Sequence, residues 1–225
     1  MTWCSNWDDI YKKSIWGRYP SEELIRFIAR QYYNVSKRED IRILEVGCGP
    51  GPNIWYLARE GFKIFGIDGS KTAIHQANLT LNKENLISYL EIGDVINLPF
   101  RNNFFDCIID IECIYANTFA DSINIIKEIN RVLKEGGMFF SKSFMKGTSG
   151  DENGITVNGE ANTYIKIFSG PLNKNYGIQR ISSLEDIKSL YSIFNIESID
   201  YTIRSSNNQE IEIREWIVVC KKSSE

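Results

Sequence analysis

The fold is decided by the stretch LEVGCGPGPN, residues 44–53, in which three glycines and two prolines follow an apolar run. The run that leads into it, residues 41–46, is short, rich in branched side chains and stopped by glycine. Such a run is typical of a buried parallel strand rather than of a helix. A glycine turn directly after a strand usually lets a ligand approach the backbone closely, so this turn is the first candidate binding site.

Strand-like and helix-like stretches alternate along the rest of the chain. The expected strands are residues 41–46, FKIFGID (62–68), ISYLEIGDV (87–95), FDCIIDI (105–111), MFFSKSF (138–144), FNIESIDYTI (194–203) and REWIVVCKK (214–222). Helices are expected around residues 53–60, after a cap at Ser70, over residues 121–134 with Gly136-Gly137 as the stop, and after the capping-box pattern of residues 182–185.

This alternation predicts an α/β protein with a parallel sheet that is covered on both faces. The last two strands are separated by only a short polar stretch, too short for a crossover helix, so they should pair antiparallel. We therefore expect a Rossmann-like doubly wound sheet of seven strands, mostly parallel with one antiparallel edge strand. Ligands of such sheets bind beyond the carboxyl ends of the strands, where the glycine turn lies.

Composition narrows the classes of protein that fit. The chain has 225 residues, of which 43% are hydrophobic. This is enough to form the core of a single domain without stabilising disulfide bonds or metal ions. A net charge of −3 with dispersed lysines and arginines argues against nucleic acid as the partner. No apolar stretch approaches the ~20 residues that cross a bilayer, and the opening residues are not those of a targeting peptide. We expect a cytoplasmic protein without a membrane partner. The five scattered cysteines predict neither disulfides nor a metal site.

Charge indicates which ligand the glycine turn meets. A dinucleotide fingerprint would need a third glycine at the position of Pro52. Glu45, at the mouth of the turn, would repel a pyrophosphate but suits an ammonium or sulfonium cation. Asp68 ends the second strand, where an acid can accept the hydroxyls of a ribose. Asp94 ends the third strand and could accept the amine of an adenine. Adenine, ribose and a cationic amino-acid tail together describe S-adenosylmethionine.

At these residues the sequence resembles the class I S-adenosylmethionine-dependent methyltransferases. LEVGCGPG is similar to their glycine motif, IFGIDGS to their ribose-acid motif and IGDVINLPF to their adenine-contact motif. FFDCIIDIECIYAN and INRVLKEGGMFF resemble their fourth strand and the helix and strand that follow. The resemblance spans residues 41–144 in family order. The opening residues are also loosely similar to bacterial methyltransferases encoded with surface-polysaccharide genes.

The resemblance implies a set of cofactor contacts. The glycine turn would hold the methionine tail, Asp68 the ribose, Asp94 and Val95 the adenine, and the end of the fourth strand the sulfonium side. Asp110 departs from the family pattern, since many relatives carry a small residue there. The cofactor-binding residues predicted in this way are Glu45, Gly47, Cys48, Gly49, Asn53, Asp68, Gly69, Ser70, Gly93, Asp94, Val95, Asp110 and Ile111.

Glu112 is the candidate catalytic residue. It follows the fourth strand, next to the expected position of the transferred methyl, and its surroundings resemble those in quinone-biosynthesis O-methyltransferases. A carboxylate there could accept a substrate proton or orient a hydroxyl. A purely structural role remains the alternative. His75, the one histidine, lies off the apolar face of its helix and is interpreted as a surface residue.

Two segments are expected to cover the substrate. Residues 1–35, with an aromatic stripe of Trp3, Trp7 and Tyr11, form a helical lid in our interpretation, or simply pack against the domain. Residues 146–180 form a substrate-covering insertion between the cofactor-binding core, residues 36–145, and a C-terminal helix with two strands, residues 181–225. The predicted substrate-binding residues are Tyr11, Trp16, Arg18, Tyr115, Tyr164 and Arg180.

These observations predict methyl transfer from S-adenosylmethionine to an oxygen or nitrogen atom of a small molecule by direct displacement. The sequence lacks the motifs that hold a flipped adenine or attack a cytosine, which favours a small-molecule acceptor. Two alternatives stay open. One is an NAD-dependent oxidoreductase on a similar sheet, and the other is a non-catalytic module that binds S-adenosylmethionine.

Overall fold

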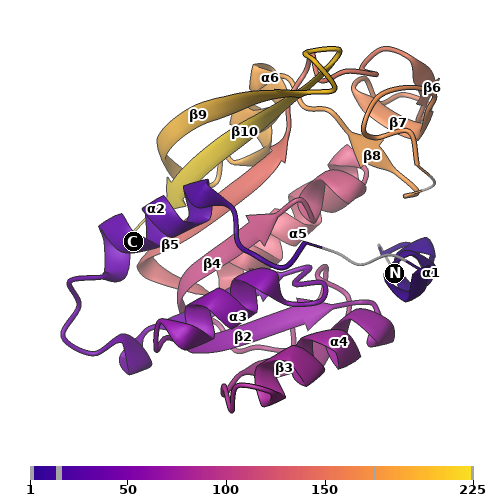
Figure 1. The fold of residues 1–225 in the computed structure, drawn as a ribbon. Helices are drawn as coiled ribbons and strands as arrows, with labels where there is room; N and C mark the ends of the chain where they lie inside the picture. Colours follow the sequence, from indigo (N-terminus) through magenta and orange to yellow (C-terminus); the bar gives the residue numbers. More distant parts are fainter. Residues whose placement is uncertain (1–2, 14–16, 175, 224–225) are drawn as a thin grey trace.

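A seven-stranded sheet runs through the centre of the molecule (Figure 1). The structure is a computed structural model that describes residues 3–13, 17–174 and 176–223. The order of the strands across the sheet is β3-β2-β1-β4-β5-β10-β9. Their bounds are β1 Arg42–Val46, β2 Lys63–Asp68, β3 Tyr89–Ile92, β4 Phe105–Ile111, β5 Leu133–Phe144, β9 Asn195–Ser206 and β10 Ile211–Lys221.

Strand direction agrees with the prediction from the sequence. Strands β1 to β5 are parallel to one another, and β10 pairs antiparallel with both β5 and β9. The reversed strand β10 is therefore flanked by β5 and by the outermost strand β9. The predicted mostly parallel α/β sheet with an antiparallel pair at its edge is confirmed.

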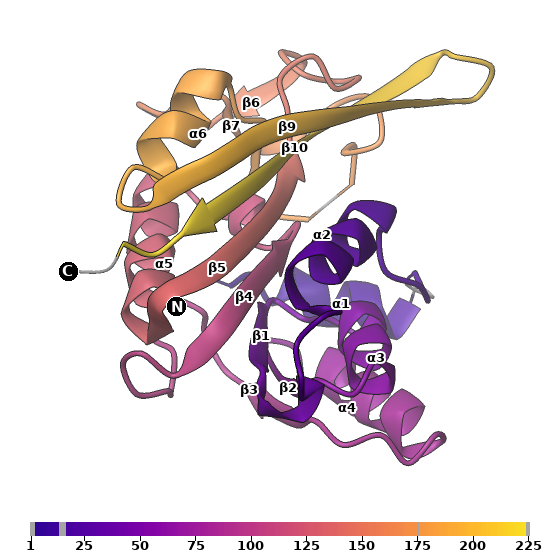
Figure 2. The ribbon, with the colours of Figure 1, turned by 90° about the vertical axis from the view of Figure 1, so that its left-hand side faces the viewer.

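Helices cover both faces of the sheet and bury two separate cores (Figure 2). Helices α2 (Glu22–Tyr32), α3 (Pro52–Arg59) and α4 (Lys71–Asn82) lie on one face, and α5 (Phe119–Val132) and α6 (Leu184–Leu190) lie on the other. Successive residues of a strand point to opposite faces of the sheet. Ile43 therefore packs in the core beneath α2, α3 and α4, and Leu44 packs in the core beneath α5 and α6. Both residues are fully buried, as expected for a central parallel strand.

The remaining elements gather beyond the carboxyl ends of the parallel strands (Figure 1). Helix α1 (Asn6–Lys13) lies beside α4, and the short 3-10 helix η2 (Ile114–Ala116) follows β4 directly. A second, three-stranded sheet of β6 (Gly154–Thr156), β7 (Thr163–Ile167) and β8 (Gln179–Arg180) fills the predicted insertion. A further 3-10 helix, η1 (Arg38–Asp40), precedes β1.

None of the helices in the described part of the chain combines the length and apolar character that crossing a membrane requires. The five cysteines are free thiols, and the described residues form no cluster of three or more His, Cys, Asp or Glu side chains that could hold a metal ion. His75 is exposed on α4, as predicted.

Candidate active site at the carboxyl ends of the strands

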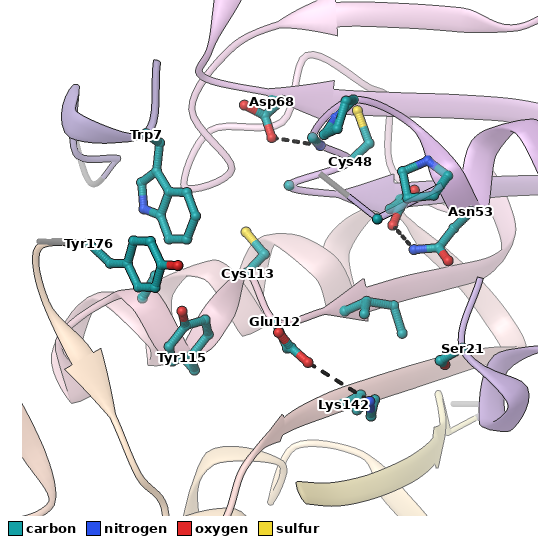
Figure 3. Close-up of a pocket in the computed structure, with 18 of the residues that line it drawn as sticks. Trp7, Ser21, Cys48, Asn53, Asp68, Glu112, Cys113, Tyr115, Lys142 and Tyr176 are labelled. Carbon is teal, nitrogen blue, oxygen red and sulfur yellow. Dashed lines mark hydrogen bonds and ion pairs between the residues drawn. The ribbon is translucent and has the colours of Figure 1, made fainter. Parts of the chain in front are cut away.

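A cavity of about 650 Å³ opens beyond the carboxyl ends of β1, β2, β4 and β5 (Figure 3). The glycine turn, the end of β2 and the loop after β3 form one half of its wall. Residues that follow β4, the end of β5, α1 and the insertion form the other half. Of the predicted cofactor-binding residues, those that line the cavity are Glu45, Gly47, Cys48, Gly49, Asn53, Asp68, Gly69, Gly93, Val95 and Ile111.

The glycine turn is held in a conformation that disfavours side chains. Gly47, Gly49 and Gly51 all have positive φ, at 65°, 52° and 80°. A Cβ atom on Gly47 would lie only 2.3 Å from the Sγ atom of Cys113. Gly51 is the N-cap of α3, and Pro52 occupies the first turn, where its missing N–H costs nothing. The turn thus brings bare backbone to the cavity, as a close ligand contact requires.

Glu45 is buried at the base of the turn. Its Oε1 atom accepts a hydrogen bond from Asn53 Nδ2 at 2.6 Å, while Oε2 is buried and accepts none from any residue that the structure describes. Burial raises the pKa of Glu45 to about 8; the Asn53 hydrogen bond opposes this rise, and the charges of Asp68 and Asp110 add to it. A buried carboxyl with one unsatisfied oxygen is well suited to an ammonium group.

Asp68 ties the end of β2 to the glycine turn. Its two oxygens accept hydrogen bonds from the backbone N–H groups of Gly49 and Ser70, each at 2.8 Å. Burial raises the pKa of Asp68 despite these two bonds. Each carboxylate oxygen can accept a second bond, so Asp68 keeps acceptor capacity toward the cavity. Ser70 itself lies outside the cavity lining and caps α4 by accepting from Ala73 N–H.

The loop after β3 meets the cavity through Gly93 and Val95. Asp94 is not among the lining residues, and its Oδ1 atom accepts a hydrogen bond from Ile96 N–H at 3.2 Å. The contact of its carboxylate with a ligand stays a prediction, whereas the flanking backbone reaches the cavity.

Asp110 lies beneath the cavity instead of lining it. Its Oδ1 atom accepts from the N–H groups of Cys113 and Ile114, and its Oδ2 atom accepts from Ser141 Oγ at 2.6 Å. Burial raises the pKa of Asp110 to about 6, although these hydrogen bonds oppose the rise. Asp110 thus caps the start of η2 from below. The expected cofactor contact is corrected to this structural role, because the carboxylate is fully enclosed by the chain.

Glu112 occupies the tight turn that Asp110 supports. Its φ is +58°, its N–H donates to the carbonyl of Lys142, and its side chain is 29% exposed at the cavity. Its Oε1 atom lies 3.8 Å from Lys142 Nζ (Figure 3). Burial, followed by a hydrogen bond with Glu215, raises the pKa of Glu112 to about 8, against the attraction of Lys142.

Three charged residues beside Glu112 were missed by the sequence analysis: Lys142, Arg204 and Glu215. Lys142 Nζ lies 3.0 Å from Glu215 Oε1, and Arg204 Nε lies 3.6 Å from Glu215 Oε2. Lys142 and Arg204 line the cavity. Because Lys142 and Glu215 stand among both polar and apolar residues in β5 and β10, their burial and pairing become visible only when the strands are paired.

Helix α1 closes one side of the cavity. Tyr11 is buried and lines the cavity, and the ring of Trp7 stacks on Tyr176 of the insertion with centroids 4.9 Å apart (Figure 3). Arg18 is exposed and lines a neighbouring hollow instead. Trp16 lies outside the described residues. The N-terminal segment and the insertion thus meet each other across the mouth of the cavity.

Besides Arg18, two further predicted substrate-binding residues do not line the cavity, while Tyr115 does. Tyr164 donates its hydroxyl to Asp151 within the insertion, at 2.9 Å. Arg180 is 2% exposed and donates to the carbonyl of Asn117 and to Ser122 Oγ. These predictions are corrected: Tyr164 forms a bond within the insertion, and Arg180 ties the insertion to the segment between η2 and α5 and to α5 itself, which sequence position alone did not reveal.

Comparison with known proteins shows similarity to methyltransferases. Residues 44–141 match the family model described as "Methyltransferase domain". A methyltransferase structure from Methanosarcina mazei superposes with a TM-score of 0.74 at 18% identity, covering 92% of this chain and 100% of that one. One from Clostridium acetobutylicum gives 0.67 at 18%, covering 96% and 95%. At 18% identity the superpositions show that the fold is the same and nothing further. The chain is thus similar to methyltransferases in the sequence of residues 44–141 and in its fold, in agreement with the class I S-adenosylmethionine-dependent methyltransferase that the sequence predicts.

The curated relatives carry different named activities. A sterol 24-C-methyltransferase of Gibberella zeae is 33% identical over 52% of this chain and 32% of its own length. A fatty-acid O-methyltransferase of Mycolicibacterium smegmatis is 33% identical over 53% of this chain and 44% of its own length. The chain thus spans less than half the length of these relatives.

Proposed function

We propose that the protein binds S-adenosylmethionine in the cavity and transfers its methyl group to an oxygen or nitrogen atom of a small molecule. The observation that carries the proposal is Glu45, whose buried Oε2 atom has no hydrogen-bond partner in the described chain and lies beside a glycine turn. A buried acceptor of this kind is costly unless a ligand satisfies it, and the amino group of a methionine tail does so.

The other lining residues fit the rest of the cofactor. Asp68 would accept a ribose hydroxyl with its remaining lone pairs, and the backbone at Gly93 and Val95 would border the adenine. The backbone of Gly47 and Gly49 would bind the carboxylate of the tail, because no side chain obstructs its approach. Ile111, at the end of β4, would lie beside the sulfonium. S-adenosylmethionine supplies an activated methyl group on a cationic sulfur when it is bound.

The residues around the acceptor have a limited chemical task. The leaving thioether is neutral, so most of the rate enhancement comes from aligning the attacking atom within ~3 Å of the methyl carbon and from excluding water. Glu112 is our candidate for the group that orients the acceptor and takes up its proton. Helix α1 and the insertion would exclude water by covering the cavity through the Trp7–Tyr176 stack.

The acceptor half of the cavity favours a molecule with an apolar body. Tyr115, Phe144, Leu172, Tyr176 and Ile213 form its walls. The named substrates of the relatives, a sterol and a fatty acid, are also apolar molecules. We therefore propose a lipid-like or aromatic acceptor rather than a nucleic acid.

A transfer assay tests this function. The purified protein is incubated with S-adenosylmethionine labelled in its methyl group and with a panel of apolar alcohols, phenols and amines, and labelled products are identified by mass spectrometry. We expect a labelled O- or N-methyl product and formation of S-adenosylhomocysteine. Tight cofactor binding without any product would instead favour the non-catalytic module, and NAD binding would favour the oxidoreductase.

A further inference from the structure

Four charged residues stand side by side on neighbouring strands of the sheet. Glu112 follows β4, Lys142 belongs to β5, Glu215 to β10 and Arg204 to β9. These strands are consecutive in the sheet, in the order β4-β5-β10-β9. Lys142 contacts both carboxylates, and Glu215 contacts both basic groups. We call these four residues the charged row.

The two ends of the charged row differ from its middle. The side chains of Glu215 and Lys142 are only 1% and 9% exposed, whereas Arg204 is 62% exposed at the outer end. Glu112 is 29% exposed at the inner end, where it lines the cavity (Figure 3). A buried ion pair is a poor source of stability, because desolvation cancels most of its attraction. Its place directly behind Glu112 points to an effect on that carboxyl.

Resting on the proposed function, we infer that Glu112 takes up the proton lost by a hydroxyl acceptor on methylation and that the charged row behind it sets the pH at which it can do so. Lys142 and Arg204 flank Glu215 and hold it as an anion, so the proton taken up stays on Glu112. Glu215 and Lys142 are therefore positioning residues, and Glu112 is the group that contacts the acceptor.

The reaction balances without any further reactant. The acceptor oxygen forms a bond to the methyl carbon, the carbon–sulfur bond breaks, and its electron pair stays on sulfur to give neutral S-adenosylhomocysteine. The hydroxyl proton passes to the ionised carboxylate of Glu112. The next cycle begins when that proton leaves Glu112 for solvent, to which the side chain of Glu112 is 29% exposed.

This arrangement selects the chemical class of the acceptor. A hydroxyl donates a hydrogen bond to Glu112 before reaction and needs a group that takes its proton. A carboxylate acceptor has no proton to lose near neutral pH, so it makes no use of a group that takes one up. An alkene carbon would leave Glu112 without its hydrogen bond. We therefore assign a hydroxyl on an apolar body, in contrast to the carbon acceptor named for the sterol methyltransferase.

The pH dependence follows from the groups that face Glu112, namely Lys142, Glu215, Arg204 and Tyr115. The raised pKa of Glu112, about 8, means that activity should rise with pH until this carboxyl is ionised. Burial opposes ionisation of Glu215, but the hydrogen bond from Glu112 and the charges of Lys142 and Arg204 outweigh it and lower the pKa of Glu215. Removing the Glu215 charge should move the midpoint of the activity profile to lower pH.

Three acceptors with the same apolar body test the assignment: 4-pentylphenol, 4-pentylbenzoate and 4-pentylstyrene. Binding of S-adenosylhomocysteine is measured first, because its absence would refute the proposed function and not this inference alone. Given binding, we expect methylation of the phenol only. Methylation of the benzoate or the styrene, or of none of the three by a protein that binds S-adenosylhomocysteine, would overturn the inference.

Variants then separate positioning from mere stability. Glu112→Gln should lower kcat for the phenol roughly 100-fold, with S-adenosylhomocysteine affinity unchanged. Glu215→Gln should move the midpoint of the kcat profile to lower pH, and Lys142→Met should move it to higher pH. Glu197→Gln, on the exposed side of β9, is the matched control and should leave the profile unchanged. Profiles of Glu215→Gln and Lys142→Met that coincide with the wild type would overturn the role of the charged row.

Discussion

Glu45 shows how one residue can link burial, ligand charge and pH. Its carboxyl is enclosed by β1 and α3, so it is easier to protonate than an exposed glutamate, with a pKa of about 8. A cation in the cavity reverses this preference, because a positive charge nearby stabilises the carboxylate. Binding of a ligand with an ammonium group should therefore release protons from the protein near pH 7.

The first prediction concerns this proton release. Glu45→Gln keeps the shape of the side chain but removes its charge, so S-adenosylhomocysteine should bind at least about 10-fold more weakly, as expected for loss of a charge-assisted hydrogen bond. Calorimetric titrations in buffers of different ionisation enthalpy measure both the affinity for S-adenosylhomocysteine and the number of protons released on binding. The exposed Glu39→Gln variant is the control. Wild-type affinity in Glu45→Gln, with unchanged proton release, would remove Glu45 from the site.

The second prediction separates backbone strain from steric contact in the glycine turn. Gly47 and Gly61 both have positive φ, but a Cβ on Gly61 would meet nothing within 4 Å. Gly61→Ala should cost about 1–2 kcal/mol of unfolding free energy from strain alone. Gly47→Ala should cost more and also abolish S-adenosylhomocysteine binding, since its Cβ meets Cys113.

Urea unfolding and calorimetric titration of both variants provide the measurement. Equal losses of stability in the two variants, with binding intact in Gly47→Ala, would contradict the steric argument.

At the scale of single residues, the sequence predicted correctly that two side chains at the carboxyl ends of strands lie at the cavity. Glu45 and Asp68 were predicted from position and charge, and both line the cavity. The prediction failed for Arg180 and Tyr164, because the strands of the insertion are too short for the sequence to show which of their side chains face a ligand. The charged row was missed because Glu215 and Lys142 lie more than seventy residues apart in sequence and meet only through the strand order.

At the scale of elements, Asp8 is one of the side chains that anchor α1. Asp8 accepts hydrogen bonds from Ser70 Oγ at 2.6 Å and from Thr72 N–H at 3.0 Å, at the N-terminus of α4. Hydrogen bonds from Lys12 and Ser70 hold the pKa of Asp8 well below its usual range. A carboxylate at a helix N-terminus is favoured by the helix dipole as well. Asp8 thus fastens α1 beside the cavity.

The third prediction tests whether α1 serves the site. Asp8→Ala should release α1, increase its cleavage by protease and weaken S-adenosylhomocysteine binding about 10-fold through loss of cover over the cavity. Asp9→Ala is the matched control, because Asp9 lies in the same turn of α1 and is exposed, and its ion pair within the described part of the chain is with Lys12. Identical behaviour of the two variants in limited proteolysis and calorimetry would show that α1 does not act as a cover.

Element boundaries were predicted less well than element types. The predicted capping box begins one residue later than expected, with Ser183 as the N-cap and Asp186 as its reciprocal partner. Helix α5 ends at Val132, before the predicted glycine stop, because the chain enters β5 at Leu133 and Gly136-Gly137 lie within that strand. The small sheet of the insertion was not anticipated, since its strands are too short for a periodic pattern.

At the scale of the molecule, three buried carboxyls make stability depend on pH. The pKa values of Glu45, Asp110 and Glu112 are all raised, by burial above all. Each group is therefore protonated more readily in the folded chain than in the unfolded chain. Its contribution to stability is complete below about pH 4 and is lost as the pH rises, through about 6 for Asp110 and about 8 for the two glutamates.

The fourth prediction follows for the protein without ligand. Its melting temperature should fall between pH 6 and pH 8, and Glu45→Gln should flatten this fall because it removes one of the titrating groups. Differential scanning calorimetry across this interval measures both slopes, with Glu39→Gln as the control. A melting temperature that rises with pH, or a slope unchanged in Glu45→Gln, would contradict the assignment of a buried, neutral carboxyl.

The architecture explains why the whole fold was more predictable than the acceptor. Alternating strands and helices leave few arrangements for a parallel sheet, and the glycine turn then fixes the edge at which a ligand binds. The acceptor half is built from β5, β9, β10 and the insertion, which no local motif marks. The residues predicted to bind the cofactor are therefore recognisable from contiguous motifs. The residues around the acceptor come together only through the pairing of strands that are distant in sequence.

The central claim is that the cavity binds S-adenosylmethionine through the glycine turn, Glu45 and Asp68. Calorimetric titration of the wild-type protein with S-adenosylhomocysteine, beside a titration with NAD and beside the Asp68→Ala variant, tests it most directly. The account predicts micromolar binding, about −8 kcal/mol, that is lost in Asp68→Ala, together with no binding of NAD. A folded wild-type protein that fails to bind S-adenosylhomocysteine, or that prefers NAD, would contradict it.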